Sequence, residues 1–353
     1  MGLLILKKLL YSISILVGVV MGLFFLFKFM PDPAQLTMGQ RSDAATIAQI
    51  RQTEHLDKPM WQQFAYYLND LSPIAAYPLN DYNAREYRYR VLWANHNNSW
   101  GIVAKMPYLR RSFQSHRRVS EILTAAIPTT FVLAIAAILL AGVLGIGLGI
   151  IAALKQNTWL DWGLIAGSVV GISQPSYVTA VILATVLGYW LHDFTHLSPS
   201  GALLMLNDYG NTVVQWQNLI LPALALGIRP VAIILQLCRS SMLDVLQQDY
   251  IRTARAKGLS EKIVLVKHAL RNALIPVVTA LSGWLAAVLT GAYFVEIIFD
   301  CKGLGFVTVN ALNVLDFPVV MGSVLLTASI FIVINFCTDI LYSIIDPRIR
   351  LYE

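Results

Sequence analysis

One polar, basic stretch of the chain, from Asp249 to Pro276, has residue types and spacing suited to contact with another protein. It reads DYIRTARAKGLSEKIVLVKHALRNALIP and lies between two long apolar runs. Its first part, 249–257, favours a helix, and Asp249 and Arg252 lie three positions apart on one face of that helix. Gly258 comes directly after a helical run that ends in cations. This pattern predicts a left-handed cap at the helix C-terminus.

A second helix is expected directly after this turn. Ser260 is a good N-cap residue, and Leu259 and Val264 are spaced to form a hydrophobic staple. A basic hairpin of this kind usually lies on anionic lipid through a broad apolar face. Here Ala254 and Ala256 stand between cations, and the small polar surface favours close contact with a protein. We therefore predict a helix-turn-helix beside the membrane that serves as a docking site.

The composition excludes an ordinary soluble domain of this length. Hydrophobic residues make up 57% and charged residues 13% of the chain, and the mean hydropathy is positive. These values indicate an integral membrane protein. The formal charge of +6 does not indicate a nucleic-acid partner, because the cations gather at the ends of apolar segments and no basic, aromatic reader motif is present.

The apolar runs predict an all-α polytopic membrane protein with six transmembrane helices. The first span, 9–30, follows Lys7 and Lys8. A cleaved signal peptide is the competing interpretation, and the length and aromatic end of the run favour a retained span. The third is interrupted by Ser173, Gln174 and Pro175, which predicts local unwinding inside the membrane. The later spans are expected at about 129–154, 162–190, 218–240, 273–299 and 318–345.

A long polar segment follows the first span and predicts an external insertion of α or α+β structure. Residues from Ile47 to Leu71 favour a helix, and those from Pro73 to Pro107 favour irregular structure with short strands. The expected organisation is a first span in 1–30, an external domain in 31–118, a five-helix core in 119–345 that contains a hairpin at 249–272, and a tail in 346–353.

The charges of the short loops predict the orientation. Lys7, Lys8, Lys155 and seven cations between Arg239 and Arg271 fall on one proposed side, whereas the short loops of the other side carry little beyond Lys302. Cationic loops remain in the cytoplasm, and long loops cross the membrane largely regardless of charge. We therefore expect both termini and the hairpin to lie in the cytoplasm.

Other candidates for chemistry are weaker. Gly142, Gly145, Gly147 and Gly149 lie in an apolar span with no following Lys-Ser or Lys-Thr, which favours close helix packing through Gly145 and Gly149 over a nucleotide loop. His192, Asp193 and His196 have the spacing of metal ligands, but they equally suit a wet membrane interface, and no metal site is predicted. The three cysteines, Cys238, Cys301 and Cys337, have no metal-ligand spacing.

Polar residues within the spans are candidates for a translocation path. Gln174, Arg229 and Glu296 are the three. Arg229 is the strongest candidate, since a cation deep in a span normally faces a cavity or a partner. Alternatively, Pro222 and Pro230 distort the helix and let the Arg229 side chain reach a backbone carbonyl or a neighbouring subunit. Glu296 lies near a span end, where its side chain is expected to reach water.

The stretch from Asp249 to Pro276 resembles the cytoplasmic coupling motif of bacterial ABC importer permeases, and most closely the dipeptide, oligopeptide and nickel permease family. The resemblance continues in other segments. These are LDKPMWQQFAYYL (56–68), LPALALG (221–227), RSSMLDVLQQDYIRTARAKGLSEK (239–262), HALRNALIPVVT (268–279), GAYFVEIIFD (291–300), GLGF (303–306), DFPVVMG (316–322) and DPRIR (346–350).

The resemblance implies roles for the hairpin residues. Gly258 would form the turn; Ala254, Arg255 and Ala256 would form the docking face; Arg252, His268 and Arg271 would be polar anchors. Asp249, Tyr250, Asn272 and Pro276 complete the expected coupling site and join it to the fifth span.

The resemblance also implies partners and a location. The chain would sit in the bacterial inner membrane, surrounded by lipid, and pair with a second, similar permease, one or two cytoplasmic ABC ATPase subunits and an extracytoplasmic substrate-binding protein. No nucleotide loop or catalytic motif occurs in the sequence, so the chain is expected to have no catalytic residues and no cofactor of its own, with ATP and magnesium held by the ATPase.

The predicted function is therefore the membrane subunit of an ATP-driven importer of small solutes, with di- or oligopeptides as the predicted substrate class. A proton-coupled secondary transporter is the alternative, but it would need ionisable residues at the centres of several spans, and apart from Arg229 they are nearly absent. A membrane scaffold for a cytoplasmic complex would explain the hairpin but not the prolines and polar breaks in the spans.

Overall fold

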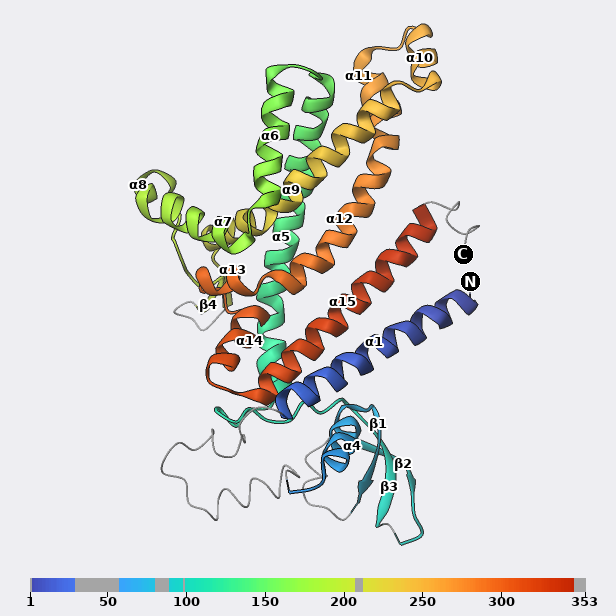
Figure 1. Cartoon of the computed structure of the whole chain (residues 1–353), viewed down its shortest axis with the longest axis vertical. Coiled ribbons are helices and arrows are strands. Elements are labelled where there is room, and N and C mark those ends of the chain that lie inside the picture. The colour runs from blue at the N-terminus through green and yellow to red at the C-terminus, as the bar shows by residue number, and fades with distance from the viewer. Residues whose placement is uncertain (1, 29–56, 80–88, 98, 207–211, 346–353) are drawn as a thin grey trace. The chain divides into compact units, whose positions relative to one another are not determined.

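The computed structural model describes residues 2–28, 57–79, 89–97, 99–206 and 212–345 (Figure 1). The chain divides into two compact units, which we describe separately. Unit 1 comprises Met1–Ala125 and Val307–Leu326, and unit 2 comprises Ala126–Phe306 and Thr327–Glu353.

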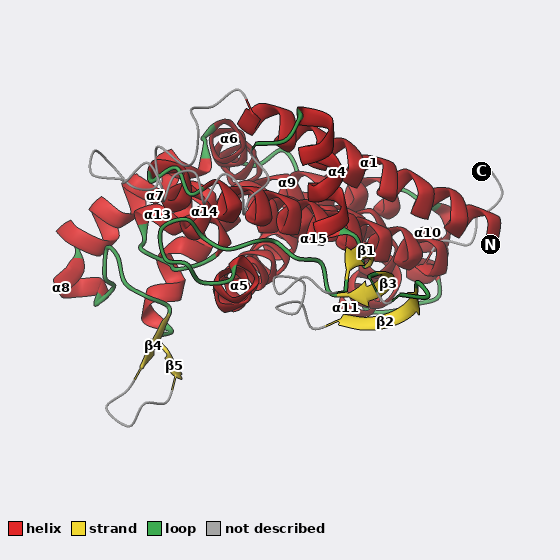
Figure 2. Ribbon diagram, turned by 90° about the horizontal axis from the view of Figure 1, so that it is seen from below, coloured by secondary structure: helices red, strands yellow, loops and turns green. Residues whose placement is uncertain are grey.

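Unit 1 combines a long apolar helix with a small α+β subdomain. Helix α1 is followed by α4 and a three-stranded antiparallel sheet in the order β1-β3-β2, seen in yellow in Figure 2. The elements are α1 (Gly2–Lys28), α4 (Met60–Leu71), β1 (Ile74–Pro78), β2 (Tyr89–Ala94) and β3 (Trp100–Lys105), with the first turns of α5 (Val119–Leu154), the end of α14 (Leu304–Asn313) and the start of α15 (Phe317–Ile345).

The subdomain has the expected short strands, but residues 57–59, which were predicted to be helical, are not. The helix predicted from Ile47 to Leu71 begins only at Met60, because Pro59, with an extended ψ of 148°, stands before its first turn. Residues 47–56 of that prediction lie outside the described residues. The side chain of Tyr67 packs with Val20 and Leu325 in the core of the unit.

Unit 2 is built from long helices and one bent pair. Its elements are the remainder of α5, α6 (Trp159–Ser173), α7 (Ser176–Leu183), the π-helix η3 (Ala184–Trp190), α8 (His192–Thr195), β4 (Leu204–Leu206), β5 (Thr212–Val214), α9 (Gln217–Leu246), α10 (Asp249–Ala256), α11 (Glu261–Ile263), the π-helix η4 (Val264–Leu270), α12 (Arg271–Gly291), α13 (Tyr293–Ile298) and parts of α14 and α15. Figure 1 shows the α5–α6 turn and the α10–α11 hairpin at one end of this unit, with α8 and α13 toward the other.

Four of the described helices are long and apolar enough to cross a membrane. They are Val119–Leu154, Gln217–Leu246, Glu261–Leu289 and Phe317–Asp339, and the pair Trp159–Ser173 and Ser176–Trp190 makes a fifth if it counts as one span. Within α1, Leu10–Leu26 is an apolar helix that is shorter than these spans. The structure thus gives four or five spans by length and composition, where the sequence predicted six.

The break predicted in the third span is confirmed. Helix α6 ends at Ser173, and Gln174 has an extended backbone with ψ of 129°. Pro175 causes this, since a proline has no N–H to donate and disfavours the helical conformation of the residue before it. The helices on the two sides of the break are bent by 107°.

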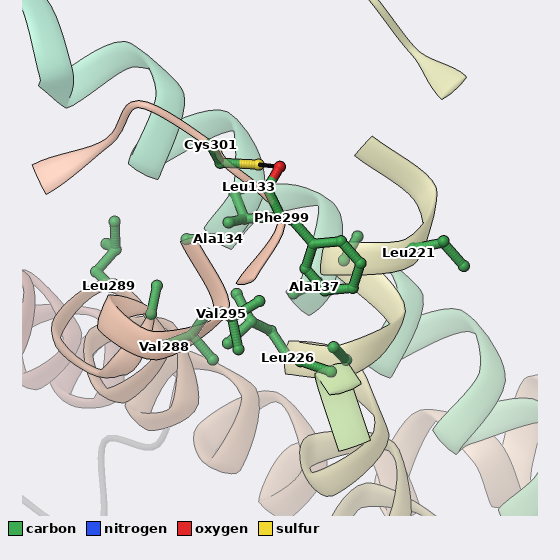
Figure 3. Close-up of a cluster of buried hydrophobic side chains, with 14 of the residues drawn as sticks. Leu133, Ala134, Ala137, Leu221, Leu226, Val288, Leu289, Val295, Phe299 and Cys301 are labelled. Atoms are coloured by element: carbon green, nitrogen blue, oxygen red, sulfur yellow. Dashed lines mark hydrogen bonds between the residues drawn. The ribbon is translucent and has the colours of Figure 1, made fainter. Parts of the chain in front are cut away.

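The interior of unit 2 contains two apolar clusters. In the first, side chains from α5, α9, α12 and α13 meet around Phe299 (Figure 3). The second joins α5, α9, the hairpin and α12 through residues such as Ile234, Met242 and Val277. Helix α9 runs through both clusters, so it connects the hairpin end of the unit to the other end.

The glycines of α5 allow this helix to approach α9 closely, as predicted for Gly145 and Gly149. A Cβ on Gly145 would lie 2.7 Å from Cγ2 of Ile234, and one on Gly149 would lie 2.7 Å from Cβ of Cys238. A Cβ on Gly147, which faces away from α9, meets nothing within 4 Å. Gly145 and Gly149 therefore form a contact face against α9.

Gly149→Ala is expected to destabilise the protein, because its methyl group would also lie 2.8 Å from the backbone oxygen of Leu235, which cannot move without shifting α9. Overpacking of this kind costs about 1–3 kcal/mol. The midpoint of thermal unfolding in detergent should fall, whereas Gly147→Ala should leave it unchanged or raise it through better helix propensity. Equal midpoints for the two variants would contradict this packing.

Candidate functional site

The basic stretch folds as the predicted hairpin, and its turn is held by backbone hydrogen bonds. The amide of Gly258 donates to the carbonyl of Arg255 at 2.9 Å, and the amide of Leu259 donates to that of Ala254 at 3.4 Å. These two bonds are a Schellman motif, which requires a left-handed residue after the helix. Gly258 supplies it with φ of +78°, so the predicted cap is confirmed.

The second helix of the hairpin differs from the prediction. Ser260 occupies the N-cap position with ψ of 145°, but its side chain makes no capping hydrogen bond. Helix α11 is short and continues as the π-helix η4, which leads directly into α12. The two arms of the hairpin are joined by Arg255, whose Nε and Nη2 donate to the Glu261 carboxylate at 2.9 and 3.3 Å.

The hairpin has a buried inner face. Ile251 and Ala254 of α10 and Val264 and Ala269 of η4 are buried and belong to the apolar cluster shared with α9 and α12. The predicted docking face is therefore wrong for Ala254, because helical periodicity places this residue one turn after Ile251 and on the same inner side. Arg255 and Ala256 are exposed.

The polar anchors also differ from those expected. Arg252 pairs with Asp249 at 3.6 Å, but both belong to α10 and both are largely exposed, so the pair does not tie the hairpin to the unit. Within the described residues, the side chains of His268 and Arg271 form no hydrogen bond or ion pair. The observed anchor is Asn272 at the start of α12, whose Nδ2 donates to Tyr250 Oη at 2.8 Å.

Pro276 lies within α12, one turn after Asn272, and is exposed. The helix continues through it. The hairpin thus passes into a long apolar helix without a loop between them.

The three candidates for a translocation path lie on separate elements. Gln174 is half-buried at the α6–α7 bend, Arg229 is exposed in the middle of α9, and Glu296 is fully buried in α13. Helix α9 continues through Pro222 and Pro230, and the Arg229 guanidinium lies over the ring of Trp284, 5.9 Å from its centroid.

Glu296 corrects the sequence interpretation. It was expected to reach water, but none of its surface is exposed. Its carboxylate accepts hydrogen bonds from Thr130 Oγ1 at 2.7 Å and from the amide of Phe306 at 3.0 Å, and the amide of Gly305 also donates to it. A buried carboxylate needs such donors, so Glu296 organises the segment Gly303–Phe306 at the first turn of α14 and does not line an open path here.

Gly303 and Gly305 allow this arrangement. A Cβ on Gly303 would lie 2.5 Å from Glu296 Oε1, and one on Gly305 would lie 2.5 Å from Cα of Tyr293. The GLGF segment therefore contains glycine where its backbone wraps a carboxylate.

No metal site is found at the histidine pair. Nδ1 of His192 lies 2.8 Å from the backbone oxygen of Leu197, and in the part of the chain that the structure describes no three His, Cys, Asp or Glu side chains could together hold a metal ion.

Comparison with known proteins identifies the family. The family model for the binding-protein-dependent transport system inner membrane component matches residues 145–351, and the model for the N-terminal region of such membrane components matches residues 1–85. The chain belongs to this family. It is a permease subunit of an ABC importer.

Bacterial relatives match between two thirds and nearly all of the chain. The chain is 33% identical to the dipeptide transport system permease protein DppB of Alkalihalophilus pseudofirmus, over 98% of each chain. It is also 33% identical to DppB of Escherichia coli K12 over 98% of each chain, and 40% identical to DppB of Bacillus subtilis over 67% of this chain and 72% of that one.

A solved structure shares the fold of the permease. A chain of the inward-facing MetNI methionine ABC transporter superposes with a TM-score of 0.51 at 14% identity, and the match covers 64% of this chain and 97% of that one.

One ion pair of the permease was missed by sequence reasoning. The guanidinium of Arg239 in α9 donates to Asp161 in α6 through Nε at 2.6 Å and Nη2 at 2.7 Å, and Asp161 also accepts from the amide of Asn157 at 3.0 Å. The side chain of Asp161 is 2% exposed. The sequence could have indicated this pair, because Asp161 and Arg239 carry opposite charges at the ends of two successive apolar runs that lie on the same predicted side of the membrane.

Asp161→Asn is expected to destabilise the permease, since it leaves the Arg239 guanidinium half-buried without its anion. Breaking a buried pair costs about 3–5 kcal/mol, and the partial exposure of Arg239 places this case near the lower end. The matched control is Asp244→Asn, which removes an exposed acid from α9, the helix that carries Arg239. The midpoint of thermal unfolding should fall clearly only for Asp161→Asn, and similar midpoints would exclude a stabilising pair.

Glu296→Gln is expected to loosen the turn at Gly303–Phe306. The glutamine amide has one acceptor oxygen, and its NH2 group would face the N–H and O–H donors that now bind the carboxylate. A buried polar group left without a hydrogen-bond partner costs about 1–3 kcal/mol. Hydrogen exchange at the amides of Gly305 and Phe306 should accelerate by roughly tenfold. Asp300→Asn, at an exposed position in the same segment, should not change it. Unchanged exchange in Glu296→Gln would mean that the carboxylate does not hold the turn.

Proposed function

We propose that this permease forms one half of the path by which an ATP-driven importer carries di- or oligopeptides into a bacterial cell. The substrate class rests on the relatives named dipeptide permeases, two of which match the chain over 98% of its length. A second, similar permease supplies the other half of the path, and an extracytoplasmic binding protein delivers the peptide.

The α10–α11 hairpin is the observation that carries the mechanism. Its inner face is buried against α9 and α12, and its outer face exposes Arg252, Arg255 and Lys257. A partner that pushes on the outer face must therefore move α9 and α12 with it, because packed apolar surfaces resist separation. The proposed partner is a cytoplasmic ABC ATPase, present in one or two copies, that binds the ATP and magnesium.

The proposed topology has six spans and both termini in the cytoplasm. Helix α1 and the bent pair α6–α7 each count as one span beside the four long helices. The turn that carries Lys155 and the hairpin lie at the same end of unit 2 (Figure 1), which supports a common cytoplasmic location for these cations.

Substitution of Gly258 tests the coupling role. The left-handed backbone at this position strains a β-branched residue by about 1–3 kcal/mol, whereas asparagine adopts it readily, and open space surrounds the site. In proteoliposomes that contain the whole transporter, Gly258→Val should lower peptide uptake per ATP hydrolysed at least tenfold. Gly258→Asn should keep the wild-type ratio.

The controls separate coupling from folding and from rival functions. Membrane insertion should be similar for the two variants, because the turn is exposed, and thermal stability should fall in Gly258→Val by no more than this backbone strain. Wild-type uptake per ATP in Gly258→Val would disprove the coupling role. Uptake by the wild type that follows a proton gradient and ignores ATP would instead establish a secondary transporter.

A further inference from the structure

The exposure pattern of α9 singles out one residue. Between Leu221 and Arg239 every side chain of this helix is buried or half-buried except that of Arg229. Helix α9 is also the most buried of the candidate spans, with 61% of its apolar window inside the structure. The one open position in the middle of this span is therefore occupied by a cation.

A cation at this depth must face something polar. A guanidinium in contact with lipid tails is costly, and charged residues of spans face a water-filled path or a partner group. In the described part of the chain, no acidic side chain forms an ion pair with Arg229. Among the described residues Arg229 therefore has no counter-charge, which leaves its guanidinium available to an external anion.

The surroundings of Arg229 orient it for an external ligand. The face of Trp284 in α12 attracts the cation, and this attraction strengthens where water is excluded. The N–H donors of a guanidinium lie in its plane, so the contact with the ring leaves donors free for a planar anion. Gly283 and Ala287, which flank Trp284, are exposed, and a Cβ on Gly283 would meet nothing within 4 Å.

We propose that Arg229, held over Trp284, binds the carboxylate of the solute in transit. The inference rests on the proposed function, since a peptide supplies a carboxylate at its C-terminus. The fork of N–H donors in arginine matches the two oxygens of a carboxylate, whereas lysine offers a point charge. Arg229 is thus a specificity-determining residue of the path, and it lies on α9, the helix against which the hairpin packs.

The test compares two probes in proteoliposomes with the complete transporter, binding protein and ATPase. Trialanine has a free carboxylate, and trialanine amide lacks it. Arg229→Gln should reduce the preference for trialanine over the amide about tenfold, and Arg229→Lys should retain part of that preference. Trp284→Leu, which removes the ring, should reduce it less than Arg229→Gln does.

Three outcomes would overturn the inference. An unchanged preference in Arg229→Gln would show that the residue does not read the carboxylate, and an equal loss of both probes would indicate a structural role. Loss of the second permease from purified Arg229→Gln complexes would show that the anion belongs to that subunit. Each of these outcomes leaves the proposed importer intact, whereas a wild type without ATP-driven uptake would refute the proposed function itself.

Discussion

The cost of holding a charge away from water constrains nearly every polar feature of this permease. An ionised group in an apolar interior is tolerated only with a counter-charge or with several hydrogen bonds. Asp161 and Arg239 satisfy this rule as a bidentate pair between α6 and α9, and Glu296 satisfies it with a hydroxyl and backbone amides. Most other charges of unit 2 lie on the hairpin or at helix ends, where water reaches them. Arg229 has no such partner among the described residues, and this departure is the basis of the role that we propose for it.

Helix α9 connects these features mechanically. Its middle carries Arg229, its C-terminal part pairs with α6, and its last turns pack against the hairpin. The glycine face of α5 lies against the same helix. In the proposed mechanism, a displacement of α10 would be transmitted to the solute along this one continuous element, which its two prolines do not interrupt.

The sequence was sufficient for features that depend on local chemistry. Gly258 after a cationic helix predicts a left-handed cap, Pro175 predicts a break, and the glycine spacing of α5 predicts close packing, because each follows from backbone geometry within a few residues. The start of α4, the buried side of Ala254 and the role of Glu296 depend on what each residue meets in space. The partners of Glu296, for example, are Thr130 and the turn at Gly303–Phe306. No local pattern brings together residues so far apart in the chain.

The shape of the hairpin and its electrostatic attraction for a partner respond differently to ionic strength. Its shape depends on backbone hydrogen bonds and on the apolar inner face, which salt screens little. The attraction exerted by Arg252 and Lys257 acts through water and weakens once the distance to a partner exceeds the Debye length, about 8 Å at physiological salt. A change in ionic strength therefore alters how fast a partner arrives at the hairpin, while the contact that it finds there keeps the same geometry.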